Sequence, residues 1–173
     1  MIKYGILLGR FQPLHFGHQH LIDKIISDGL EPIIILGTAQ ESRTKNNPYT
    51  PLERIHMLKL LYPNIQAYAL DDSDSWDDWY DRLILTILLA VTDNLDEVTI
   101  YLHDKIEDLQ NFTFKGIDYT NSSYSTLFHI DGMHTTKLEL SSIQIRAQSI
   151  RNDLENNKQY LDPKIYSYIK SII

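Results

Sequence analysis

Apolar and polar positions divide the N-terminal part of the chain into alternating strands and helices. Uninterrupted runs of apolar residues are typical of strands buried on both faces of a sheet. Such runs predict strands at 4–8, 32–36, 65–70 and 98–102. Between them, apolar residues recur at the spacing of one helical face, which predicts helices over 19–26, 51–61 and 79–91.

Boundary residues support the second helix in particular. Thr50 is a suitable N-cap, Pro51 suits the first helical position, and Pro63 ends the helix. The resulting β-α-β-α-β-α-β order predicts an α/β fold, a Rossmann-like doubly wound parallel sheet. In such sheets, ligands bind beyond the carboxyl ends of the strands.

The C-terminal part of the chain has a weaker pattern. It predicts strands at 112–114 and 127–130, with a polar loop over 119–125. Ser141 or Ser142 is expected to cap a helix that reaches about residue 154, and Pro163 opens a final helix. We find no repeat or linker, so the prediction is a single domain over 1–173 that ends in helices.

Composition narrows the class of protein. The net charge of −7 argues against general nucleic-acid binding. If an acidic protein like this one binds anionic nucleotides, its cations must be concentrated locally. The chain has no cysteine, its N-terminus does not resemble a secretion signal, and its most apolar helix is too short for a bilayer. We expect a cytoplasmic protein without a membrane partner; the sequence leaves the oligomeric state open and allows a homo-oligomer.

Candidate chemistry is concentrated where the first strand passes into the first helix. His15 and His18 flank Gly17 there, and Arg10 precedes them. A helix N-terminus attracts anions, a glycine lets a ligand approach the backbone, and an arginine fork suits phosphate. These residues favour a phosphate site. The alternatives are a metal site that includes His20, or two polar loop residues without chemistry.

The segment from Gly9 to His18, Gly-Arg-Phe-Gln-Pro-Leu-His-Phe-Gly-His, resembles the first signature of the HxGH nucleotidyltransferase superfamily. Its first half is similar to archaeal-type nicotinamide mononucleotide (NMN) adenylyltransferases and their relatives in bacteria and phages. Leu14 and Phe16 differ from the common form, which has Phe and a basic residue there. The segment Leu-Ser-Ser-Ile-Gln-Ile-Arg at 140–146 resembles the second signature, with Ile143 in place of the usual threonine.

The resemblance implies which residues bind ATP. The first signature supplies Gly9, Arg10, Phe11, His15, Gly17 and His18. The second signature supplies Ser141, Ser142 and Arg146. Of these, His15, His18, Arg10 and Arg146 are implied to be catalytic.

The same resemblance implies an NMN site. A similar loop follows the second strand in the family, with Gly-Ser-Ala-Gln and Asn-Pro-Phe-Thr elements, and here it supplies Gln40, Arg43 and Asn47. Gln12 joins them from the first signature. Trp79, where the third helix is predicted to begin, is expected to stack on the cationic nicotinamide ring. The carboxylates at 71–78 do not fit an EF-hand, since the glycine and the final glutamate are missing.

The implied activity is transfer of AMP from ATP to NMN, which gives NAD and pyrophosphate. Mg²⁺ would arrive mainly with ATP, and no protein metal site is expected. His103 and Lys105 follow the fourth strand and are expected at the same edge. Two alternatives stay open: a relative that uses another acceptor, such as phosphopantetheine, FMN or a cytidylyl acceptor, and a nucleotide sensor without catalysis, which Ile143 favours.

Overall fold

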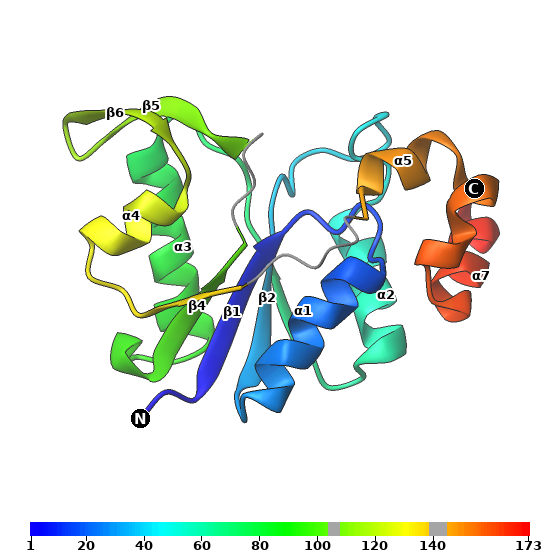
Figure 1. Cartoon of the computed structure of the whole chain (residues 1–173), viewed down its shortest axis with the longest axis horizontal. Coiled ribbons are helices and arrows are strands. Elements are labelled where there is room, and N and C mark those ends of the chain that lie inside the picture. The colour runs from blue at the N-terminus through cyan, green and yellow to red at the C-terminus, as the bar shows by residue number, and fades with distance from the viewer. Residues whose placement is uncertain (104–107, 139–144) are drawn as a thin grey trace.

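The computed structural model describes residues 1–103, 108–138 and 145–173. Its centre is a sheet of five parallel strands in the order β3-β2-β1-β4-β7 (Figure 1). The strands are β1 (Tyr4–Gly9), β2 (Glu31–Leu36), β3 (Gln66–Ala69), β4 (Val98–Leu102) and β7 (Thr135–Lys137). The predicted Rossmann-like doubly wound sheet is therefore confirmed, and the strand order reverses beside β1.

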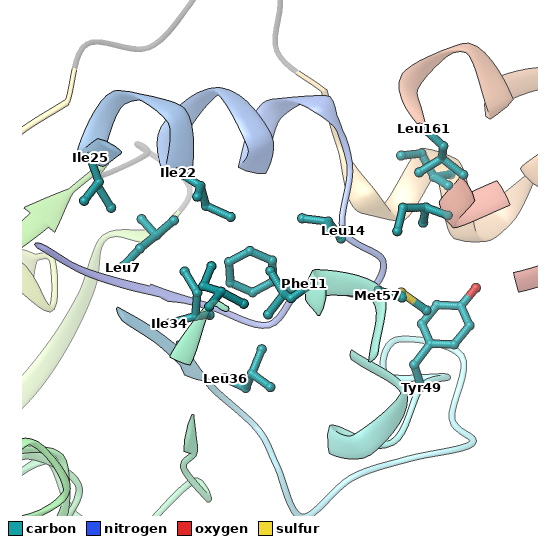
Figure 2. Packing of buried hydrophobic residues seen from close by; sticks show 14 of the residues in the cluster. Leu7, Phe11, Leu14, Ile22, Ile25, Ile34, Leu36, Tyr49, Met57 and Leu161 are labelled. Carbon is teal, nitrogen blue, oxygen red and sulfur yellow. The ribbon is translucent and has the colours of Figure 1, made fainter. Parts of the chain in front are cut away.

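Helices cover both faces of this sheet (Figure 1). One face carries α1 (Phe16–Ser27) and α2 (Pro51–Leu61), and α7 (Pro163–Ile172) packs outside α2. The other face carries α3 (Trp76–Ala90) and α4 (Ser125–Ile130). Alternate strand residues enter the two cores; in Figure 2, Leu7 and Ile34 meet Ile22 and Ile25 of α1.

The second helix forms where local signals predicted it, and the first and third begin three residues earlier than expected. Thr50 caps α2 with Pro51 at its first position, and Glu53 bonds back to the Thr50 amide. The third helix begins at Trp76, one turn earlier than expected, because Ser75 accepts a hydrogen bond from the Asp78 amide. Among the described residues, no helix is long and apolar enough to cross a membrane.

The region between β4 and β7 differs from the prediction. The expected loop at 119–125 is wrong in part, since β6 (Ile117–Ser122) pairs with β5 (Gln110–Phe114) as an antiparallel hairpin. Lys115 and Gly116 form its two-residue turn, both at positive φ (50° and 75°). This conformation matches the twist of paired strands, and a glycine in the second position favours it.

Two further expectations in this region are corrected. The strand predicted at 127–130 is helix α4, because Leu127 and Phe128 are buried together on one helical face. Strand β7 was not predicted, since Thr135, Thr136 and Lys137 contain no apolar run. It is an edge strand that is held by pairing with β4.

The helix that was expected to follow Ser141 or Ser142 begins later than predicted. Arg146 has an extended backbone (φ −107°, ψ 120°) and is the N-cap of α5 (Ala147–Asn152). Asp153 is not helical either, and it separates α5 from α6 (Leu154–Asn157) and a short 3-10 turn, η3 (Lys158–Tyr160). A continuous helix through residues 146 to 154 is therefore wrong. The expected caps Ser141 and Ser142 lie outside the described residues.

Candidate active site

A cavity of about 900 Å³ opens at the carboxyl edge of the sheet. Gly9, Gly37, Leu70 and His103, at or just beyond the ends of β1, β2, β3 and β4, all line it. The cavity therefore opens at the edge where the strand order predicted a ligand site. In Figure 1 this edge is uppermost, with the β5–β6 hairpin on one side and α5 on the other.

His15 and His18 lock each other at the start of α1. The Nδ1 atom of His15 accepts a hydrogen bond from the Gly17 amide (3.0 Å), and Nδ1 of His18 accepts one from the His15 amide (3.2 Å). The rings stack with centroids 3.8 Å apart. An imidazole nitrogen that accepts a hydrogen bond carries no proton, so each neutral ring has its proton on Nε2. Each histidine can therefore donate from Nε2.

Gly17 leaves room for the ring of His15. A Cβ atom at this position would lie 2.8 Å from Cε1 and 2.9 Å from Nδ1 of His15. The His15 ring, and not a ligand, thus occupies the space over the glycine and takes up its amide. Contact between ATP and Gly17 stays a prediction. Glycine is required here because any side chain would displace the first histidine.

Arg10 lines the cavity and is held by the loop between β2 and α2. Its Nη1 donates to Oδ1 of buried Asn47 (3.3 Å), and Nδ2 of Asn47 donates to Glu41 (2.7 Å). Asn47 does not line the cavity. In this structure it orients the arginine, and direct contact between Asn47 and NMN stays a prediction.

Two buried polar side chains hold the loops in place. Gln12 is 1% exposed; its amide donates to the Tyr49 carbonyl (3.1 Å) and accepts from the Tyr49 N–H (3.0 Å). Arg54 is fully buried and donates to the carbonyls of Arg10 (2.9 Å) and Gly37 (2.8 Å). Burial, and then the nearby charge of Arg10, lower the pKa of Arg54. Gln12, which the sequence marked for NMN, also lines the cavity, so NMN contact by Gln12 stays a prediction.

The other predicted NMN residues divide into two groups. Gln40 bonds to Asp72, and exposed Arg43 pairs with Glu53 (2.6 Å); neither lines the cavity. Trp79 does line it, together with Trp76, whose ring centroid is 5.3 Å away at an interplanar angle of 80°. NMN contact by Gln40, Arg43 and Trp79 stays a prediction.

The cavity separates charges of opposite sign. Arg10, His15 and His18 lie at the β1–α1 end, whereas Asp72, Asp74 and the tryptophans lie at the α3 end. In the described parts of the chain, no three His, Asp or Glu side chains gather in a way that could hold a metal ion. The donor set at the β1–α1 end is cationic and suits phosphate rather than a bare cation.

The second signature reaches the same place. Ile145 and Ala147 line the cavity, and Cβ of Ile145 is 3.8 Å from the Cβ position on Gly17. Arg146, between them, is exposed and is not among the lining residues, so its role stays a prediction. Lys105 and Ser141 lie outside the described residues.

Several residues that line the cavity were not marked by the sequence, and Arg151 is the cationic one. Arg151 of α5 lines the cavity and donates from Nη1 to the Gln12 carbonyl (3.0 Å). Burial, and then the charge of Arg10, lower the pKa of Arg151. The sequence gives little indication that Arg151 lines the cavity, because the direction of its side chain depends on the residue at which α5 begins. With the helix starting at Ala147, the residue that reaches the cavity is Arg151.

Comparison with known proteins was consistent with this geometry. A nicotinamide-nucleotide adenylyltransferase from Aeropyrum pernix is 39% identical over 84 residues, 49% of this chain and 42% of that protein. One from Methanolobus tindarius is 44% identical over 87 residues, 48% of this chain and 50% of that protein. The chain thus spans about half the length of these relatives or less.

Solved structures share the fold. The crystal structure of a bifunctional NMN adenylyltransferase/ADP ribose pyrophosphatase from Francisella tularensis has a TM-score of 0.77 at 20% identity, covering 99% of this chain and 49% of that one. A crystal structure of the same description, complexed with AMP and a manganese ion, has a TM-score of 0.72 at 19% identity, with the same coverage.

The match to a family model spans both signatures. The model is described as cytidylyltransferase-like and matches residues 6–152, from β1 to the end of α5. This segment includes every wall of the cavity. The chain belongs to the cytidylyltransferase-like family.

Proposed function

We propose that this chain transfers AMP from ATP to NMN, giving NAD and pyrophosphate. The observation that carries the proposal is one cavity with groups suited to phosphate at one end and tryptophans beside carboxylates at the other. ATP and NMN are both anionic through phosphate, and NMN also has a cationic ring. The names of the partial relatives from Aeropyrum pernix and Methanolobus tindarius support the same activity.

The chemistry requires no nucleophile from the protein. A phosphate oxygen of NMN attacks the α-phosphorus of ATP in line, the new P–O bond forms, and the bond to the β-phosphate oxygen breaks. Pyrophosphate leaves with the electron pair. The protein must align two anions and stabilise the charge that develops between them.

His15, His18 and Arg10 would supply that stabilisation. Because both Nδ1 atoms accept hydrogen bonds within the protein, each neutral ring carries its proton on Nε2 and would direct that N–H at a phosphate oxygen. The ring of His18 also packs on Phe11 (centroids 4.3 Å apart), so its position is fixed before substrate binds. Gly9, Phe11 and Gly17 then contribute by shaping this end of the cavity, and Arg146, Ser141 and Ser142 contribute from the second signature.

The nicotinamide ring would lie at the α3 end. An indole face attracts a cationic ring, and the carboxylates of Asp72 and Asp74 favour positive charge there. Trp79 is our choice for the stacking residue. Gln12 acts through the Tyr49 backbone, and Asn47 through Arg10.

The metal would enter with the nucleotide. ATP phosphates coordinate a divalent cation while water fills the remaining positions, and we propose Mg²⁺. The structure of the Francisella tularensis protein with AMP and a manganese ion supports the use of a divalent metal. We further propose a cytoplasmic protein whose partners are these two small molecules, without nucleic acid or membrane, and for which a homo-oligomer is allowed.

Pyrophosphate release tests the proposal. The chain is incubated with MgATP and one acceptor at a time: NMN, phosphopantetheine or FMN. A parallel incubation replaces ATP with CTP and supplies a cytidylyl acceptor. NMN should be the productive acceptor, with NAD formed in equal amount to pyrophosphate. Turnover with a different acceptor only would replace NMN in the proposal. ATP binding without turnover on any acceptor would favour the nucleotide sensor.

A further inference from the structure

The arginines of this chain differ in what they already bind. Arg43 pairs with Glu53 (2.6 Å), and Arg82 pairs with Asp78 (3.0 Å). Both Nη atoms of Arg54 donate to backbone carbonyls. Arg146 is exposed at the N-cap of α5 and does not line the cavity. The remaining two of the six arginines, Arg10 and Arg151, both line it.

Within the described residues, these two cations have few partners. Arg10 donates to the neutral Asn47 side chain, and Arg151 donates to the Gln12 carbonyl. Within the described residues, neither guanidinium forms an ion pair with a carboxylate. A guanidinium has several N–H donors in a planar fork, so most donors of both side chains are available.

The two charges also act on each other. Arg151 is half-buried, and Arg10 is close enough that its charge helps to lower the pKa of Arg151. Bringing two like charges together in a partly desolvated cavity is unfavourable unless an anion joins them. The imidazoles of His15 and His18 line the same end of the cavity and add two more donors.

We propose that Arg151 binds the triphosphate of ATP opposite Arg10, which makes it a substrate-binding residue that the signature pattern does not mark. The proposal rests on the proposed function, since that function places ATP in this cavity. It also gives α5 a direct part in the site. The hydrogen bond to Gln12 then serves to aim the guanidinium, because Gln12 is itself held by the Tyr49 backbone.

A purely structural role is the competing explanation. Arg151 could simply tie α5 to the β1–α1 loop through the Gln12 carbonyl. A carbonyl, however, needs only one neutral N–H donor, which a glutamine also has. The structural role therefore predicts that Arg151→Gln is either tolerated or lowers Tm together with the affinity for ATP and adenosine, whereas phosphate binding predicts a loss confined to ATP.

Three variants separate the two explanations. Arg151→Gln removes the charge and keeps an N–H donor that is two bonds closer to the backbone than Nη1, and Arg151→Lys keeps the charge and loses the fork. Arg82→Gln is the matched control, since it removes an exposed arginine on α3 that does not line the cavity. Calorimetry measures the affinities of each protein for ATP, adenosine and NMN, and thermal unfolding monitors the fold.

We expect Arg151→Gln to bind ATP about tenfold to a hundredfold more weakly, the loss for charge-assisted hydrogen bonds. Adenosine, which has no phosphate, and NMN should bind as tightly as before, and Tm should stay close to wild type. Arg151→Lys should recover part of the ATP affinity. Arg82→Gln should match wild type throughout.

Other results overturn the inference. If Arg151→Gln binds ATP like wild type, or loses ATP and adenosine affinity together with Tm, Arg151 is structural. If NMN affinity falls and ATP affinity does not, the triphosphate assignment is wrong. These outcomes are independent of turnover: wild-type protein that makes NAD while Arg151→Gln binds ATP normally refutes only the role of Arg151. Arg151-dependent ATP binding without NAD formation refutes only the proposed function.

Discussion

The smallest unit of the site is the interlocked pair of histidines around Gly17. Each Nδ1 atom accepts a backbone N–H near the start of α1, and the missing Cβ of Gly17 leaves room for the first ring. The side chains therefore complete the helix terminus and hold their own tautomer at once. The same two bonds aim both Nε2–H groups, which explains why this spacing suits phosphate chemistry.

Variants of His18 test its two roles separately, as the acceptor of the His15 amide and as an Nε2–H donor. Asparagine at this position keeps an acceptor for the His15 amide and has no counterpart of Nε2–H, whereas glutamine can place an N–H near Nε2. We expect His18→Asn and His18→Ala to lower kcat by about a hundredfold to a thousandfold, the scale for one oxyanion donor. His18→Gln should lose less. Steady-state rates of pyrophosphate release measure this, and normal turnover in His18→Ala would refute a catalytic role.

Gly17 gives a prediction on stability. Gly17→Ala places a Cβ 2.8 Å from the His15 ring, which must then move and release the Gly17 amide. We expect the free energy of unfolding to fall by about 1–3 kcal/mol, as for overpacking of a buried side chain. Gly37→Ala is the matched control, because its Cβ would meet only Cγ of Arg10 at 3.9 Å. Urea denaturation compares the two; equal losses would contradict the clash.

At the scale of elements, sequence signals succeeded where they act within one turn. The cap of α2 and the range Val98–Leu102 of β4 match their predictions, since Thr50, Pro51 and an unbroken apolar run act locally. They did not reveal β7, because its three polar residues become a strand only by pairing with β4. Helix α4 was mistaken for a strand for a similar reason: its short apolar run suits either element until neighbouring side chains decide.

The amino terminus of α2 depends on the charge of Glu53. The hydrogen bonds from Arg43, chiefly, hold the pKa of Glu53 below its usual value. A carboxyl with a lowered folded-state pKa stabilises the protein above its unfolded-state pKa, and this contribution is lost as the pH falls through the folded-state value. We expect Glu53→Gln to destabilise the protein by about 0.5 kcal/mol at pH 7, as a half-exposed ion pair would.

The pH dependence provides the check. The difference between wild type and Glu53→Gln should shrink as the pH falls below about 4, where the unfolded-state carboxyl is protonated. Urea denaturation at pH 7 and at pH 3 measures it. Asp93→Asn, which removes an exposed carboxylate in a loop, should show no such change. A constant difference across this range would mean that the charge of Glu53 is not involved.

At the scale of the whole molecule, the sheet brings together segments from both ends of the chain. The β1–α1 loop and α5 meet through the bond from Arg151 to the Gln12 carbonyl (3.0 Å). The opposite wall consists of the start of α3 and the segment before β5, with Asp72, Asp74 and Asp108. An acidic protein thus keeps a cationic region at one end of the cavity and an acidic, aromatic region at the other.

This separation predicts that the two substrates respond to different variants. Trp79→Ala should raise KM for NMN by about fivefold to thirtyfold, the factor for a desolvated cation–π pair, while KM for ATP changes less than about twofold. Trp79→Phe should lose less. Initial rates with each substrate varied in turn provide the test. If Trp76→Ala shows the NMN effect and Trp79→Ala does not, the stacking residue is Trp76.

The amino-acid sequence by itself determined the alternation of strands and helices, the position of the first signature between β1 and α1, and the edge of the sheet where the cavity opens. Periodicity, caps and the order of elements depend on residues that are close in the chain, so they can be recognised without coordinates. The two histidines and Arg10 belong to this class.

Only the tertiary structure decided which of the remaining polar residues reach the cavity. Arg54 proved to bind backbone carbonyls, Arg43 to pair with Glu53, and Arg151 to line the cavity, which Gln12 also lines while it bonds to the Tyr49 backbone. These outcomes depend on where α5 begins and on contacts between residues far apart in the chain. A side chain acquires its partner from packing, and no local pattern specifies that partner.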